Sequence, residues 1–157
     1  MTVLLLLPPA ASAANGMTPV SAVCKYFSLS DAQQVFGPTA SRVPGAARGT
    51  CQYAAPPATL KADSTPRTSP GVIVQAWRDP KPRGFAVKPT PEALLVRVGP
   101  VNGWYVAPPT ATDTNAVAGT GTLAFYEKGR LFHVGAMGTK DDLATSAQVG
   151  SLVLHHL

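Results

Sequence analysis

A short basic and aromatic stretch in the middle of the chain is the part of the sequence best suited to binding chemistry. Its cations attract anionic groups, and its rings stack on flat ones. We predict a patch for a ligand or an anionic partner, with these members: Trp77, Arg78, Lys81, Arg83, Phe85 and Trp104. The same residues also suit a solvated loop, and the sequence leaves both interpretations open. No nucleic-acid-binding motif accompanies the stretch, so we expect no nucleic acid partner.

Histidines, which often act in catalysis and metal binding, form no recognisable site in this sequence. His155 and His156 are adjacent, and neighbours on a helix diverge by about 100°, which makes them a poor chelate. We expect both to face solvent, and we place His133 on a strand. The motifs C-x-x-C, H-E-x-x-H and G-x-S-x-G do not occur. We therefore predict no catalytic residues, no metal site and no cofactor.

Gly119, Gly121 and Ala124 match the spacing of a dinucleotide-binding loop. Such a loop needs a strand before it and a helix after it, so that the phosphate meets the helix N-terminus. Here we expect a loop before it and a strand after it, which excludes that function.

The chain has two cysteines, Cys24 and Cys51. In an exported protein an even number favours a disulfide. Two buried free thiols are one alternative. Acylation of Cys24 in a lipoprotein is another, but Val23 is larger than the residue that usually precedes an acylated cysteine. A lipid anchor would also leave Cys51 unpaired.

The first 13 residues resemble the end of a secretory signal peptide. The apolar run Val3–Leu7 is followed by Ala11-Ser12-Ala13, which matches the A-x-A pattern of a cleavage site. We expect export and a single mature domain of residues 14–157, secreted or in the cell envelope. The alternative is an Ala- and Pro-rich terminus without a targeting role, since no Lys or Arg precedes the run. The run is too short for a transmembrane segment, which needs about 18 residues.

The composition is typical of one folded domain with an excess of positive charge. Hydrophobic residues make up 45% of the chain, enough for a core at this length of 157 residues. Charged residues make up only 13%, with a net charge of +5, which favours anionic partners.

Turn residues divide the chain into short elements. Residues 28–37 are predicted to form a helix, with Ser30 and Gln33 as its capping box and Gly37 at its end. Residues 50–53, 72–78, 94–98 and 104–106 are predicted strands.

The strongest pattern is a hairpin over residues 123–134. A turn at Lys128-Gly129 places Phe125 opposite Phe132 on the buried face, with Glu127 opposite Arg130. In this register His133 points to the other face.

The chain ends in a predicted helix with one narrow stripe of apolar and small residues, capped by Thr139 and Asp142. The stripe consists of Leu143, Ala147, Gly150, Leu154 and Leu157. Small residues in its middle predict close approach to a sheet. Together these elements predict an α+β fold, in which a curved antiparallel sheet of about five or six strands carries an N-terminal and a C-terminal helix on one face.

The order of these features resembles a family of small actinobacterial exported proteins and lipoproteins of unknown function. The similarity lies in Cys24, the helix ending Val35-Phe36-Gly37, Cys51-Gln52-Tyr53 and Ala124-Phe125-Tyr126. It covers roughly Val23 to Leu157. More weakly, the layout is similar to extracellular sensor domains of some mycobacterial kinases. Both resemblances imply an α+β domain outside the cytoplasm, and neither supplies catalytic residues.

These observations lead to two hypotheses of function. The first is an exported cell-envelope binding or sensing module without catalytic activity, whose partner is an anionic envelope component or another envelope protein. The second is a secreted hydrolase with an unrecognised active site.

Overall fold

The computed structural model describes residues 16–56, 69–79, 90–107 and 121–157. In these ranges the chain forms an antiparallel sheet of eight strands and two α-helices, an α+β fold. The elements follow in this order: β1 (Thr18–Pro19), the 3₁₀ helix η1 (Val23–Lys25), α2 (Leu29–Phe36), β2 (Ser41–Arg42), β3 (Thr50–Ala54), β4 (Gly71–Arg78), β5 (Leu94–Val98), β6 (Val101–Val106), β7 (Thr122–Glu127), β8 (Arg130–Met137) and α3 (Asp142–His155).

The sheet is open, with the strand order β2-β3-β4-β8-β7-β6-β5. The pairing of β3 with β4 ends at Gln75, and β1 pairs with Trp77 and Arg78 beyond that point. The strand count is larger than predicted, because the sequence analysis missed β1 and β2. Strands of two residues carry no periodic pattern that a sequence could reveal.

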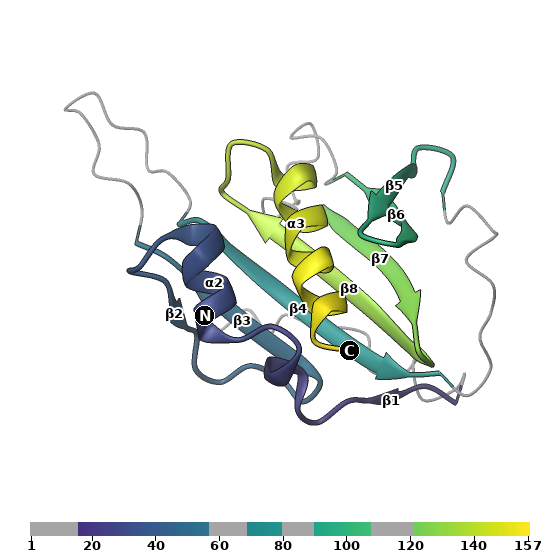
Figure 1. The fold of residues 1–157 in the computed structure, drawn as a ribbon, viewed down its shortest axis with the longest axis horizontal. Coiled ribbons are helices and arrows are strands. Elements are labelled where there is room, and N and C mark those ends of the chain that lie inside the picture. The colour runs from purple at the N-terminus through teal and green to yellow at the C-terminus, as the bar shows by residue number, and fades with distance from the viewer. Residues whose placement is uncertain (1–15, 57–68, 80–89, 108–120) are drawn as a thin grey trace, which may run out of the picture.

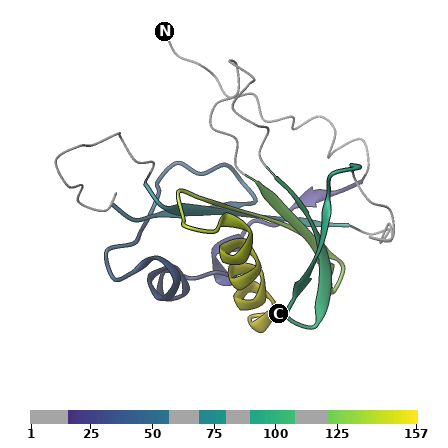
Figure 2. The same ribbon diagram turned by 90° about the horizontal axis from the view of Figure 1, so that it is seen from above.

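Both α-helices lie on the same face of the sheet, here called the inner face (Figures 1 and 2). α3 runs along the middle of the sheet and packs on β8, β7 and β5, while α2 lies beside it over β3. Alternate residues of the long strands point to this face. They form most of the core, which includes Val74, Leu123, Phe125, Phe132 and Val134. Neither α-helix in the described ranges has the length and apolar character of a membrane span.

The disulfide between Cys24 and Cys51 is confirmed, with a Cα–Cα distance of 5.2 Å. It ties η1 to β3 and closes a loop across a sequence separation of 27. A disulfide that closes a loop of this size stabilises a protein by about 3–4 kcal/mol in the chain-entropy model. This is a large share of the stability of a small domain.

The β7–β8 hairpin has the predicted register. Phe125 pairs with Phe132, Glu127 pairs with Arg130, and both phenylalanines are fully buried with their rings stacked at 5.3 Å. His133 points to the outer face, opposite the helices, as predicted. The hairpin turn is Lys128-Gly129, and both residues have positive φ.

The N-cap of helix α2 lies two residues before the predicted one. Ser28 is the N-cap, and its hydroxyl accepts a hydrogen bond from the backbone N–H of Asp31. The Asp31 carboxylate in turn accepts from the backbone N–H of Ser28, which completes a capping box. The predicted box of Ser30 and Gln33 is wrong, because the sequence offers two serines at similar spacing.

Helix α3 packs on the sheet through a stripe rotated from the predicted one. Its buried residues are Ser146, Val149, Gly150 and Val153, while Leu143, Ala147 and Leu154 are only partly buried. Gly150 lies at the closest approach. A Cβ atom built there would be 2.7 Å from Cγ1 of Val98.

His156 is exposed, as predicted, but its ring also contacts the start of α2. Its Nε2 lies 3.0 Å from Oδ2 of Asp31, in the capping box of α2. This contact, called the helix clasp below, joins the end of α3 to the start of α2. The two helices meet only in the tertiary structure, so no local pattern could indicate the contact.

Candidate functional site

The predicted basic and aromatic patch is divided by strand geometry. Trp77 and Arg78 are consecutive residues of β4, so their side chains point to opposite faces of the sheet. Trp104 lies on β6, which is separated from β4 by two strands, β8 and β7. Lys81, Arg83 and Phe85 lie outside the described residues, so the patch as a whole stays a prediction.

Arg78 instead belongs to a different cluster of positive charge. It pairs directly with Arg130 across β4 and β8, at the end of the inner-face column that contains Ala76 and Phe132. Side chains paired in this way have Cβ atoms roughly 4.5–5.5 Å apart, and like charges there repel. The fold therefore holds two guanidinium groups side by side at one end of the sheet.

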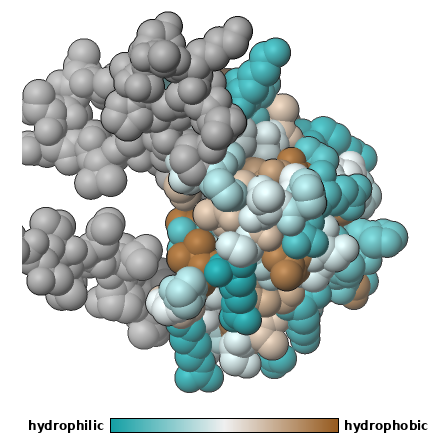
Figure 3. Space-filling view, turned by 90° about the vertical axis from the view of Figure 1, so that its left-hand side faces the viewer, coloured by the Kyte–Doolittle hydropathy of each residue, from teal (hydrophilic) through white to brown (hydrophobic). Residues whose placement is uncertain are grey.

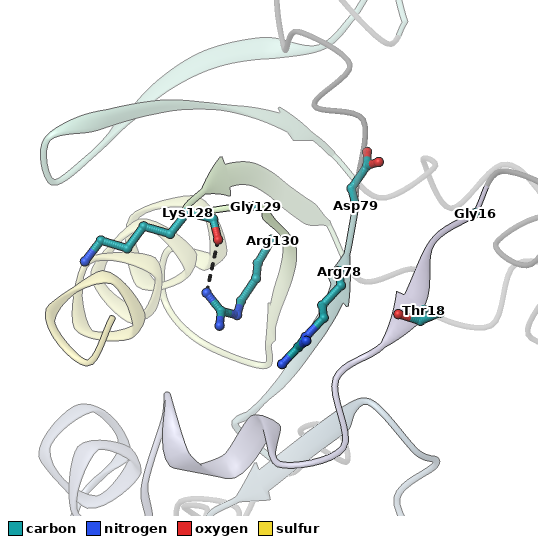
Figure 4. Close-up of a pocket in the computed structure, with 7 residues that line it drawn as sticks. All are labelled: Gly16, Thr18, Arg78, Asp79, Lys128, Gly129 and Arg130. Carbon is teal, nitrogen blue, oxygen red and sulfur yellow. Dashed lines mark hydrogen bonds between the residues drawn. The ribbon is translucent and has the colours of Figure 1, made fainter.

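Within the described ranges, no carboxylate forms a salt bridge with either arginine of this pair. Glu127 lies opposite Arg130 on β7, yet the salt bridge found among the described residues is the one between His156 and Asp31. The carboxylate of Asp79 points away from the two guanidinium groups (Figure 4). Net positive charge therefore remains at this end of the sheet.

Arg130 is held by neutral groups. Its Nη1 donates a hydrogen bond to the backbone oxygen of Lys128 at 3.1 Å. Its guanidinium lies 5.6 Å from the ring centre of Tyr26, within reach of a cation–π contact. Its Nε–H is buried and has no hydrogen-bond partner, an arrangement that costs about 1–3 kcal/mol.

A surface pocket of about 540 Å³ lies beside the arginine pair (Figure 4). This hairpin pocket is lined by Gly16, Thr18, Arg78, Asp79, Lys128, Gly129 and Arg130. It forms because β1 joins the end of β4 next to the β7–β8 turn. Asp79 joins the end of β4 to the hairpin turn, because its backbone N–H donates a hydrogen bond to the oxygen of Gly129 at 3.1 Å.

A second pocket of about 290 Å³ adjoins the first and shares Thr18 and Arg78 with it. This Tyr26 pocket is lined by Thr18, Pro19, Val20, Ser21, Ala22, Lys25, Tyr26, Arg48 and Arg78. The Lys25 ammonium lies 4.8 Å from the centre of the Tyr26 ring. The five cations of the two pockets are called the basic end below: Lys25, Arg48, Arg78, Lys128 and Arg130.

The outer face of the sheet carries the other side chains with chemical interest. The ring of Trp77 meets the ring of His133 edge to face at 4.8 Å. Burial lowers the pKa of His133 to about 4, so its imidazole is neutral near pH 7. Within the described residues, no three His, Cys, Asp or Glu side chains gather closely enough to hold a metal ion.

The surface around α2 and β2 is mixed in character. Hydrophilic and hydrophobic residues alternate over the part that Figure 3 shows in colour, and the hydrophobic areas there are small. A wide apolar docking surface is therefore not seen on this side of the described residues.

The sequence analysis found only one of the five cations of the basic end, Arg78. The hairpin register placed Arg130 at a strand start, but only the pairing of β4 with β8 brings it beside Arg78. Lys25 on η1 and Arg48 in the segment before β3 reach the basic end because these segments pack beside β4. A signal did exist at Lys128, a lysine before glycine in a tight turn, but it indicated turn geometry and not binding.

Comparisons with known proteins leave the family open. No family model matches the chain. No curated protein and no solved structure shows significant similarity to it. Any proposal about function therefore depends on the geometry of the chain itself.

Proposed function

We propose that the protein is an exported binding or sensing module of the cell envelope, which holds an anionic partner at its basic end. The observation that carries this proposal is the Arg78–Arg130 pair, two adjacent cations that form no salt bridge with any carboxylate of the described residues. Such an arrangement costs free energy in the isolated protein, and an anion between the two groups removes that cost.

The disulfide supports a location outside the cytoplasm, because disulfides persist in oxidising compartments. The signal-peptide pattern of residues 1–13 and the resemblance to exported actinobacterial proteins point the same way. Cys24 bonded to Cys51 has no free thiol for acylation, which argues against this cysteine as a lipid attachment point.

Binding is favoured over catalysis by the nature of the site. The basic end consists of cations, of which Lys25 and Arg130 lie against the Tyr26 ring and Arg130 also bonds a backbone oxygen. These side chains attract and orient an anion at neutral pH, and none of them is a ready proton acceptor there.

The test compares two charge-neutralising double variants of the full chain. We expect Arg78→Gln with Arg130→Gln to weaken binding to dextran sulfate at least about tenfold in titration calorimetry, through loss of direct ion contacts. Arg42→Gln with Arg97→Gln removes the same charge at exposed positions that line neither pocket, and is expected to change affinity less than twofold. Neutral dextran is the control ligand.

Equal losses in the two double variants would contradict the proposal, because they would show attraction by net charge alone. Turnover of an envelope substrate that survives loss of both pocket arginines would favour the hydrolase hypothesis instead.

A further inference from the structure

The two pockets of the basic end meet at one arginine. Arg78 and Thr18 line both of them, so Arg78 stands between the two hollows. The hairpin pocket adds Lys128 and Arg130, and the Tyr26 pocket adds Lys25 and Arg48. A ligand that extends across Arg78 therefore meets further cations on both sides.

From this arrangement, and resting on the proposed function, we infer that the ligand is a linear molecule with two or more linked phosphoryl groups, one in each pocket. A diphosphate is the shortest such ligand, and a longer polyphosphate or a phosphate polymer has the same chemistry.

Phosphoryl oxygens match the donors at this end of the sheet. An arginine guanidinium forms paired hydrogen bonds with phosphate oxygens, and two adjacent guanidiniums grip one group from two sides. Arg130 also has an Nε–H without a partner. A small rotation of this side chain toward a phosphoryl oxygen gives that N–H an acceptor.

Charge also favours linked phosphoryl groups over a single carboxylate. Asp79 is the one acidic residue among the described residues that line the two pockets, and its carboxylate points away from the arginines. Positive charge around the two pockets is therefore compensated little by the described carboxylates. A lone carboxylate carries one negative charge, whereas each phosphoryl group adds charge and further acceptor oxygens.

Division of the cations between two pockets favours a ligand with two groups. Volumes of about 540 Å³ and 290 Å³ each admit a phosphoryl group. Once the first group is bound, the second binds at a high effective concentration because it is tethered. Affinity is therefore expected to rise steeply from one phosphoryl group to two or more.

The experiment measures the affinity of the full chain for four probes at constant ionic strength, by titration calorimetry near neutral pH. The probes are orthophosphate, pyrophosphate, tripolyphosphate and citrate. We expect tripolyphosphate to bind at least about tenfold more tightly than orthophosphate. Citrate carries three carboxylates and serves as the polycarboxylate control. It is expected to bind at least about tenfold more weakly than tripolyphosphate, because it does not offer the phosphoryl geometry.

Single variants assign the two pockets. Arg130→Gln is expected to weaken orthophosphate and tripolyphosphate alike, since it removes half of the arginine pair. Arg48→Gln is expected to weaken tripolyphosphate at least about fivefold and to leave orthophosphate unchanged, since it removes only the second contact. Arg97→Gln, on β5, is the matched control and should change neither affinity. Arg48 and Arg97 are exposed, so both variants are expected to fold.

Three results would overturn this inference. Citrate binding as tightly as tripolyphosphate would show a site for polyanions in general, and the proposed function would stand without it. An unchanged tripolyphosphate affinity in Arg48→Gln would show a single pocket. Binding to vesicles of equal parts phosphatidylglycerol and phosphatidylcholine, without binding to tripolyphosphate, would identify a membrane surface instead. If the Arg78→Gln, Arg130→Gln double variant bound dextran sulfate as tightly as the Arg42→Gln, Arg97→Gln control, the proposed function would be contradicted as well.

Discussion

Individual residues at the basic end adopt arrangements that the fold alone does not favour. Arg78 lies opposite another cation, and the Nε–H of Arg130 is buried without a partner. Lys128 has φ +47°, the single non-glycine residue with positive φ among the described residues. Lysine is disfavoured in this left-handed conformation, which asparagine and glycine tolerate better. Energetically unfavourable arrangements that gather in one region are typical of a binding site.

Replacement of Lys128 should therefore separate stability from binding. Lys128→Asn is expected to raise the free energy of unfolding by about 1 kcal/mol, because asparagine suits the first position of this turn. The same variant should bind tripolyphosphate more weakly, because an ammonium group is lost from the hairpin pocket. Urea unfolding and titration calorimetry measure the two effects.

Lys140→Asn is the matched control, since Lys140 is exposed and has ordinary φ. It should leave both quantities nearly unchanged. A Lys128→Asn protein that is less stable than the parent would contradict the strain argument.

At the scale of elements, α3 is the main support of the inner face. Ser146 helps to hold the helix on the sheet, because its hydroxyl accepts a hydrogen bond from the backbone N–H of Ala136 on β8 at 3.1 Å. Gly150 allows the helix to come close to the sheet, where Val98 and Phe125 lie beneath it. The helix is placed by these contacts and by the clasp at its end.

A larger residue at position 150 should push the helix off the sheet. Gly150→Leu is expected to lower the free energy of unfolding by about 1–3 kcal/mol through overpacking, although leucine is the better helix former. A Cβ atom alone would already be 2.7 Å from Cγ1 of Val98 and 3.1 Å from Cε1 of Phe125. Thermal and urea unfolding measure the change.

Ala144→Leu is the control on the same helix, because Ala144 is exposed. It is expected to be close to neutral. If Gly150→Leu also proved neutral or stabilising, the described docking of α3 would be wrong.

The helix clasp should make stability depend on pH at the acid end. Burial raises the pKa of Asp31, but the hydrogen bonds from Ser28 and the contact with His156 outweigh burial, so the pKa lies below its usual value of 3.8. The stabilisation is therefore fully present above pH 3.8 and is lost as the pH falls through the lowered pKa. We expect Asp31→Asn to be about 1 kcal/mol less stable than the parent near neutral pH, and the difference to shrink below pH 3.8.

Urea unfolding across the acid range tests this expectation, with Glu92→Gln as the control at an exposed carboxylate. His156→Ala should show part of the same loss, since it removes one of the bonds to Asp31. A difference between Asp31→Asn and the parent that stays constant with pH would show that the charge of Asp31 contributes nothing.

Across the whole molecule, the buried core and the concentrated positive charge lie in different places. Two helices cover the inner face and bury the core (Figure 2). The basic end begins where that apolar column stops, as Ala76 and Phe132 give way to Arg78 and Arg130. A rigid sheet with a disulfide beside it thus positions a concentrated positive charge, which suits a module that binds anions.

Local patterns in the sequence determined the elements of this protein. Alternation in residues 72–78, the register around Lys128-Gly129 and the cysteine pair each depend on near neighbours or on one chemical bond, so the sequence was sufficient. The capping box of α2 was placed on the wrong serine, because Ser28 with Asp31 and Ser30 with Gln33 both have the spacing of a capping box.

Only the tertiary structure decided which of these elements meet. β4 pairs with β8 across a long stretch of chain, and this pairing places Arg78 beside Arg130. The contact of His156 with Asp31 likewise joins the two ends of the domain. Both contacts join residues that are far apart in the sequence, and they form only after the core has brought these segments together. They therefore leave no local pattern in the sequence. The longer elements could therefore be predicted from the sequence, while the two-residue strands β1 and β2 and the candidate site could not.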